Sequence, residues 1–144
     1  MAIIKWTDEW GLGLAESDTG RRELVGLYNE IYLALKRGDS RRTLLGGMTR
    51  LLDCAESVFA EEEQLMEAAG YPMWPEHRDE HCDFLQRMRR FESTLAEGRL
   101  TIDLPVLQFM RHWFTGHLND SDGAFGRFLA RNPGALVALA IQPV

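Results

Sequence analysis

Apolar residues recur every three to four positions in four long stretches of the chain, the spacing of helices with one buried face. These stretches span about 18–36, 40–69, 75–97 and 103–131. Glycine follows the first three stretches closely, which is typical of a helix C-terminus, and Ser40 is a predicted N-cap. Four amphipathic helices joined by short connections predict an all-α, up-down-up-down four-helix bundle.

The two ends of the chain lack this pattern. Residues 1–17 contain Trp6 and Trp10 without a helical period, and we expect them to form an arm along the bundle. Residues 132–144 are mostly apolar and are predicted to pack as a short helix or to mediate association between copies. The 144 residues are therefore predicted to form one domain, with an arm, a bundle over 18–131 and a tail.

Composition and charge exclude several classes of function. The formal net charge is −6 and no face is rich in Lys or Arg, so no nucleic-acid or membrane partner is expected. Arginine pairs such as Arg21-Arg22 are separated by acids, which is typical of solvated helix surface. Cys54 and Cys82 form no disulfide framework, and we expect neither a signal peptide nor a membrane span, so a cytoplasmic location is expected.

Polar residues interrupt the apolar stripes of the last three helices. Glu62, His77, His81 and His117 stand where apolar residues are expected, and Asp122 follows five positions after His117. Buried carboxylates and imidazoles are costly unless they are paired or bind a metal. Together they form a ligand set for iron, zinc or manganese, so these five residues are a candidate metal site. The alternative is a set of core histidines hydrogen-bonded to the two carboxylates, without metal.

These polar residues also belong to a longer pattern of motifs, which runs from Trp6 to about Leu129. Its parts are Gly13-Leu14, Asp18 with Leu24-x-x-Leu27-x-Asn29, Phe59-x-x-Glu62-Glu63-x-Leu65-Met66, Gly70-Tyr71-Pro72, His77-x-x-x-His81, Trp113-x-x-x-His117-Leu118 and Asp122. In order and spacing the pattern resembles a hemerythrin of the bacterial type. The resemblance implies a four-helix bundle with two bridged irons that bind O2 reversibly, held by five histidines and two bridging carboxylates.

One half of that ligand set has counterparts in this sequence. The resemblance implies that His77, His81 and His117 are the histidines of one iron. It also implies that Glu62 and Asp122 are the bridging carboxylates.

The histidines of the other iron are missing. Arg21 stands three residues after Asp18, and Val58 stands just before Phe59, where the resemblance implies histidines. The first half of the chain has no histidine at all, and His112 is expected to point away from the site.

A charged residue at the first vacant position suggests how the carboxylates are neutralised. We hypothesise that the Arg21 guanidinium replaces the second metal and forks across Glu62 and Asp122, while Val58 fills the remaining space. The alternative is an ordinary surface arginine. The acidic run 61–63 is expected to be solvated apart from its central residue.

The sequence therefore predicts a non-enzymatic, hemerythrin-like protein with a degenerate, non-haem site. One iron per chain is favoured, with zinc or manganese as alternatives. Reversible O2 carriage draws two electrons from two irons, so the expected role is sensing of O2, NO or metal, or storage. The first alternative is a diiron O2-binding protein in which Asp18, Glu63 or water completes the second iron. The second is a metal-free bundle that binds another protein.

Overall fold

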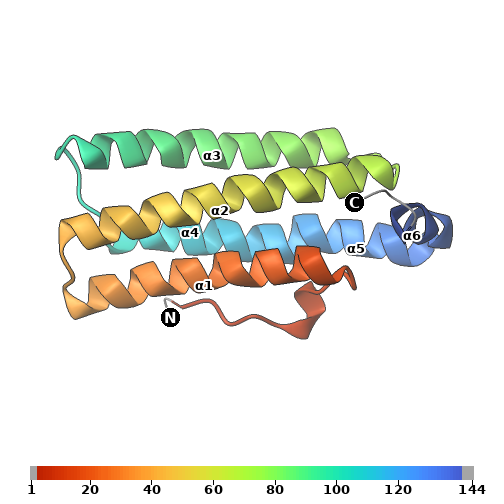
Figure 1. The fold of residues 1–144 in the computed structure, drawn as a ribbon, viewed down its shortest axis with the longest axis horizontal. Helices are drawn as coiled ribbons and strands as arrows, with labels where there is room; N and C mark the ends of the chain where they lie inside the picture. Colours follow the sequence, from red (N-terminus) through yellow and green to blue (C-terminus); the bar gives the residue numbers. More distant parts are fainter. Residues whose placement is uncertain (1–2, 141–144) are drawn as a thin grey trace.

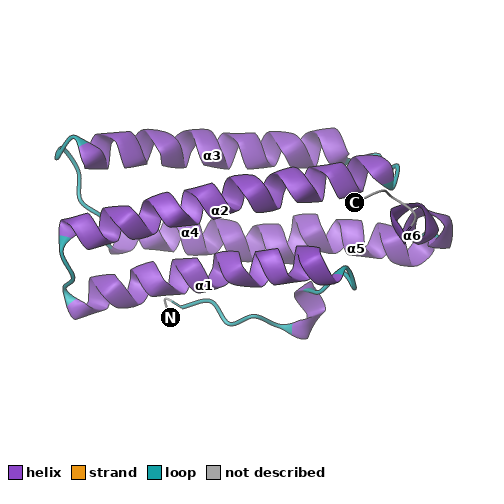
Figure 2. Cartoon of the chain, in the orientation of Figure 1, coloured by secondary structure: helices purple, strands orange, loops and turns teal. Residues whose placement is uncertain are grey.

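The computed structural model describes residues 3–140 and confirms the all-helical bundle. Antiparallel helices run alternately up and down (Figure 1). The last of the four is one long helix with three segments: α4, a π-helical turn and α5. The helices are α1 (Ala15–Arg37), α2 (Arg41–Ala68), α3 (Trp74–Ala96), α4 (Leu104–Gly116), the π turn (His117–Ser121), α5 (Asp122–Arg131) and a short α6 (Pro133–Ala140). Figure 2 shows helices and loops but no strand within the described residues.

Local signals end α1 and begin α2 and α4 close to where the sequence predicts these helix ends. Gly38 has a φ of 78°, in the left-handed region that glycine adopts most easily, and it ends α1. The Ser40 side chain accepts a hydrogen bond from the Thr43 N–H at 3.2 Å, which caps α2. Asp103 caps α4 in the same way through the Val106 N–H. These caps fix where the helices begin and end.

The apolar stripes meet in two clusters of buried side chains. The larger cluster fills most of the bundle and includes Phe59, Phe84 and Phe114. The smaller one, with Met66 and Phe125, lies toward α6. Along α2 and along the last helix, the polar positions of the stripe fall between members of the two clusters. The candidate site is thus enclosed in apolar packing on both sides.

The N-terminal arm packs along the bundle (Figure 1). Its Ile4 donates from the backbone N–H to Asn29 Oδ1 at 2.7 Å and accepts from Asn29 Nδ2 at 2.8 Å. Farther on, the Trp10 indole donates to Asn119 Oδ1 at 2.6 Å. The first helix begins at residue 15 rather than 18, because the Asp18 carboxylate folds back and accepts from the N–H groups of the preceding loop.

The tail forms helix α6 as far as Ala140, and Ile141 lies outside the described residues. Ala135 and Leu139 pack onto the smaller cluster, whereas Leu136 and Val137 are exposed. Within residues 3–140, no helix has both the length and the apolar character needed to cross a bilayer.

Candidate metal centre

Five polar side chains from three of the four bundle helices converge on one point. Glu62 comes from α2, His77 and His81 from α3, His117 from the π turn and Asp122 from the start of α5. Each is at most 4% exposed, which is unusual for charged and polar groups. We call these residues the inner cluster. One donor atom from each of the first four lies within 4.8 Å of the others.

The distances between these donor atoms are those of ligands around a single cation. His81 Nε2 and His117 Nε2 are 2.9 Å apart, and Glu62 Oε1 is 3.4 Å and 3.6 Å from those two atoms. Asp122 Oδ1 lies 3.2 Å from both His77 Nε2 and His117 Nε2. Neighbouring ligands at about 2.1 Å from a metal, at right angles, are about 3 Å apart. The inner cluster could therefore hold a metal ion.

Without a metal, protons would hold this cluster together. Burial alone would lower the pKa of His77, but its hydrogen bonds with Asp122 and Glu62 raise that pKa to about 9. Burial likewise opposes charge on His117, yet the same two carboxylates raise its pKa above the usual value. Burial would raise the pKa of Glu62, but the histidines hold it well below the usual range. The cluster thus binds positive charge, from protons or from a divalent cation.

The π turn brings His117 and Asp122 to the same side of the last helix. Five residues along an α-helix correspond to about 500°, which would leave the two side chains about 140° apart. In a π turn the backbone bond instead closes over five residues, and here the Asp122 N–H donates to the His117 carbonyl. One wide turn therefore supplies two members of the inner cluster.

Two further carboxylates hold the outer nitrogens of the histidines. Glu63 Oε2 accepts from His81 Nδ1 at 2.9 Å, and Glu80 Oε1 accepts from His117 Nδ1 at 2.7 Å. The Ser121 hydroxyl lies 2.8 Å and 2.9 Å from the two oxygens of Glu80. The hydrogen bond with His117 is the main reason that the pKa of Glu80 is lowered to about 2. Burial acts in the opposite direction and would raise this pKa.

The sequence does not predict that Glu63 and Glu80 accept hydrogen bonds from the histidines of the site. Glu63 was expected to be solvated, whereas its side chain is 23% exposed and bonded to a buried histidine. Glu80 was not singled out, although its position next to His81 is a usable signal. Adjacent residues on a helix point about 100° apart, so a neighbour of an inward side chain reaches toward an adjoining helix.

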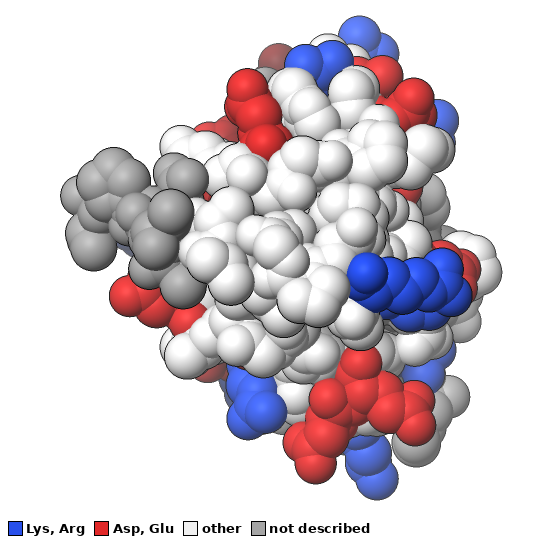
Figure 3. All heavy atoms as spheres, turned by 90° about the vertical axis from the view of Figure 1, so that its right-hand side faces the viewer, with Lys and Arg blue, Asp and Glu red and all other residues white. Residues whose placement is uncertain are grey.

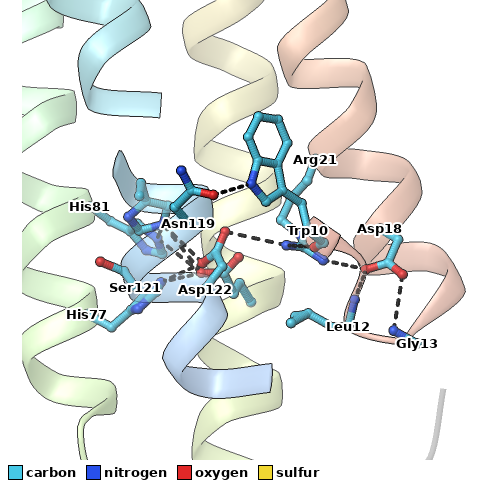
Figure 4. A network of polar contacts seen from close by, with 12 residues as sticks. Trp10, Leu12, Gly13, Asp18, Arg21, His77, His81, Asn119, Ser121 and Asp122 are labelled. Carbon is cyan, nitrogen blue, oxygen red and sulfur yellow. Dashed lines mark hydrogen bonds and ion pairs between the residues drawn. The ribbon is translucent and has the colours of Figure 1, made fainter. Parts of the chain in front are cut away.

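Arg21 is buried beside the inner cluster, with 2% of its surface exposed. Its Nη1 lies 3.5 Å from Asp122 Oδ2 and donates to the Trp10 carbonyl at 2.9 Å. Its Nη2 pairs with Asp18 (Figure 4). Within the described residues its ion pairs are with Asp18 and Asp122, so the expected fork across Asp122 and Glu62 is not formed.

The expectation of a solvated arginine pair is wrong for Arg21 and correct for Arg22. The arm contacts the first side chain through the Trp10 carbonyl, and both guanidinium groups lie near the Trp6 ring, 5.8 Å and 5.0 Å from its centroid. Arg22, by contrast, is exposed. The arm, which the helical pattern does not place, decides which arginine is buried.

The remaining candidates lie away from the inner cluster. Val58 packs at the edge of the larger apolar cluster, close to Gly20 on α1. His112 is exposed, as expected. Cys54 is half-buried, and burial raises the pKa of its thiol, while Cys82 is exposed.

A cavity of about 10 Å³ adjoins the inner cluster. Its polar wall is formed by Arg21, Glu62, His117 and Asp122, and the rest of the lining is apolar. A site needs about 10–15 Å³ to hold one water molecule, so this space accommodates about one. The space beside Arg21 and the two carboxylates is therefore small.

Comparison with known proteins gives one consistent family. A family model described as the hemerythrin HHE cation binding domain matches residues 18–129. The chain is 27% identical over 126 residues to a bacteriohemerythrin of Stenotrophomonas maltophilia, which covers 87% of this chain and 80% of that protein. It is 28% identical over 136 residues to a bacteriohemerythrin of Ralstonia nicotianae, which covers 94% of this chain and 96% of that protein.

Solved structures agree on the fold. A wild-type hemerythrin crystal structure superimposes with a TM-score of 0.81 at 21% identity, covering 88% of this chain and 97% of the other. A point mutant of hemerythrin gives the same TM-score of 0.81 at 22% identity, over the same shares of the two chains. At this level of identity the agreement concerns the course of the helices.

Proposed function

Because the chain belongs to the hemerythrin family, whose domain model matches residues 18–129, we propose that it holds one non-haem metal ion in the inner cluster. His77, His81 and His117 would supply three nitrogens, and Glu62 and Asp122 would supply carboxylate oxygens. The observation that carries the proposal is the buried Arg21 guanidinium 3.5 Å from Asp122 Oδ2.

A fixed positive charge at this position disfavours a second metal. The guanidinium is always charged, and it offsets the charge of Asp122 that a second cation would otherwise neutralise. Two unit charges about 4 Å apart repel by on the order of 4 kcal/mol at an effective dielectric constant of about 20, and a divalent cation would be repelled more strongly. Arg21 therefore acts as a permanent substitute for the second cation.

The diiron alternative lacks free donors. Asp18 is paired with Arg21 and accepts from two backbone N–H groups. Glu63 accepts from His81 Nδ1. Each carboxylate that would have to complete a second iron already has a partner, which favours the single-metal interpretation.

Iron is the metal that the family favours, while zinc and manganese suit the same ligands. A ferrous ion bound there would supply an open position for a diatomic molecule such as O2 or NO. A single iron does not share two electrons with a neighbour, so we propose sensing of such a molecule or of metal, or metal storage, rather than O2 carriage. The proposal assigns no catalysis, and a cytoplasmic location stays a prediction.

The metal content of the protein tests this proposal. We expect about one iron per chain, by plasma mass spectrometry, after expression in iron-supplemented medium, without the near-ultraviolet bands of a bridged diiron centre. H81A should lose the metal, whereas H112A, which changes an exposed histidine, should keep it. Two irons per chain would favour the diiron alternative. A chain that binds no metal would be a hydrogen-bonded bundle, and a role in protein binding would then be favoured.

A further inference from the structure

Two histidines of the inner cluster are held from behind by carboxylates of a neighbouring helix. Glu63 on α2 reaches His81 on α3, and Glu80 on α3 reaches His117 on the last helix. Each of these carboxylates is next in sequence to an inner-cluster residue. The same arrangement thus occurs twice around the bundle, from α2 to α3 and from α3 to the π turn.

This arrangement determines which nitrogen of each ring faces the centre. A carboxylate accepts, so Nδ1 of each ring carries the proton that it donates. The Nε2 lone pairs of His81 and His117 are then directed at the point where the donor atoms converge, 2.9 Å from each other. A carboxylate behind a metal-bound histidine orients the ring and makes its nitrogen a stronger ligand.

Glu80 is itself fixed. The Ser121 hydroxyl lies within hydrogen-bond distance of both of its oxygens, and Ser121 is the last residue of the π turn. The Glu80 carboxylate therefore connects α3 to both ends of that turn, through His117 and through Ser121. A partly exposed acid, which water could otherwise solvate, is held in one orientation behind a buried ring.

We propose that Glu63 and Glu80 are positioning residues that set the metal affinity of the inner cluster. They hold the His81 and His117 rings with Nε2 inward and add negative charge behind them. The inference rests on the proposed function, because it requires that the cluster bind a metal. It goes further because Glu63 and Glu80, which are not metal ligands themselves, would set how tightly the metal binds.

The test compares E63Q and E80Q with variants of their exposed neighbours, E61Q and D79N. Glutamine keeps an oxygen that accepts from Nδ1–H but removes the charge, and E80A removes both. Zinc affinity is measured by competition with a chromophoric chelator. We expect affinity to fall about 10–100-fold in E80A, less in E63Q and E80Q, and to stay within about twofold of wild type in both controls.

Two further readouts separate positioning from simple destabilisation. We expect E63Q and E80Q to shift the absorption bands of the cobalt(II)-loaded protein while leaving the melting temperature of the metal-free protein close to that of the controls. A loss of affinity accompanied by an equal loss of metal-free stability would overturn the inference.

Metal content of the wild type separates this inference from the proposed function. One metal per chain, with E63Q and E80Q binding as tightly as E61Q and D79N, would overturn the inference and leave the proposed function standing. Two metals per chain would overturn the single-metal proposal, while weaker binding by the two variants would still support positioning. A wild type that binds no metal would overturn both.

Discussion

At the scale of single residues, the burial of Arg21 distinguishes this site from a plain cluster of histidines and carboxylates. Its guanidinium contacts Asp122, Asp18 and the Trp10 carbonyl, and the arm covers it. A buried charge is tolerated only when its partners are in place, so each of these groups depends on the others. Asp122 is the member of this network that also faces His77 and His117.

Removing this guanidinium should be costly. We expect R21A to lower the free energy of unfolding of the metal-free protein by about 3–5 kcal/mol, because Asp122 is left buried without its cation. Metal content should fall as well, since Asp122 is then no longer held. Urea denaturation and mass spectrometry measure the two effects.

The matched control is R22A. Arg22 is exposed and lies 5.0 Å from the centroid of the Trp6 ring, so its loss should change stability by about 0.5 kcal/mol or less. An R21A protein with the metal content and melting temperature of the wild type would refute the assigned role of Arg21.

At the scale of elements, the π turn between α4 and α5 decides where Asp122 points. It holds one residue more than an α-helical turn, so the helix keeps its direction while His117 and Asp122 share one side. The upstream part of this helix packs in the larger cluster and the downstream part in the smaller one. The apolar side chains of both parts face the core because the π turn accommodates the extra residue between them.

Deleting Asp120 tests this account. Asp120 is exposed, and its removal should convert the π turn into an α-helical turn without rotating α5. A spacing of four residues still places His117 and Asp122 on one face. We therefore expect metal content to be retained and the melting temperature to change little.

Deletion of Ala124 is the control for this experiment. It lies beyond the turn, so its loss should rotate Phe125 and Leu129 by about 100° out of the smaller cluster and unfold that end. If removing Asp120 proved as harmful as removing Ala124, the turn would not be a one-residue insertion in an otherwise regular helix.

At the scale of the whole molecule, charge is distributed unevenly over the surface. The end that carries α6 is uncharged at its centre and bordered by acidic and basic side chains (Figure 3). Met73, Leu136 and Val137 are exposed there, 51%, 40% and 61% respectively. Exposed apolar side chains at an uncharged end favour association, whereas the net charge of −6 opposes it.

Association of two copies through this end therefore stays a prediction of the sequence that can be measured. We expect the mass from light scattering to rise with protein concentration and V137E to abolish that rise, because a charge would be buried between the copies. L33E, at an exposed leucine in the C-terminal half of α1, is the control and should behave as the wild type. A wild type that is monomeric at every concentration would contradict the prediction.

The helices, their order and the five inward-facing polar residues could be predicted from the sequence. Periodicity, caps and glycine stops are local properties, so residues as different as Ser40 and Gly38 could be interpreted from their neighbours in the chain. The spacing of His77 and His81 placed two rings on one face without knowledge of the other helices. For these reasons the bundle and the five residues that converge in it were predictable.

The groups that surround those five residues depend on how the arm and the helices pack together. The burial of Arg21 depends on an arm without periodicity, and the partners of Glu63 and Glu80 lie on other helices. Whether a charged residue on a helix is solvated or buried depends on the segment that packs over it. That segment is often far away in the sequence. The side-chain pattern of one helix carries no information about that cover, so the polar network around the centre emerged only from the packed bundle.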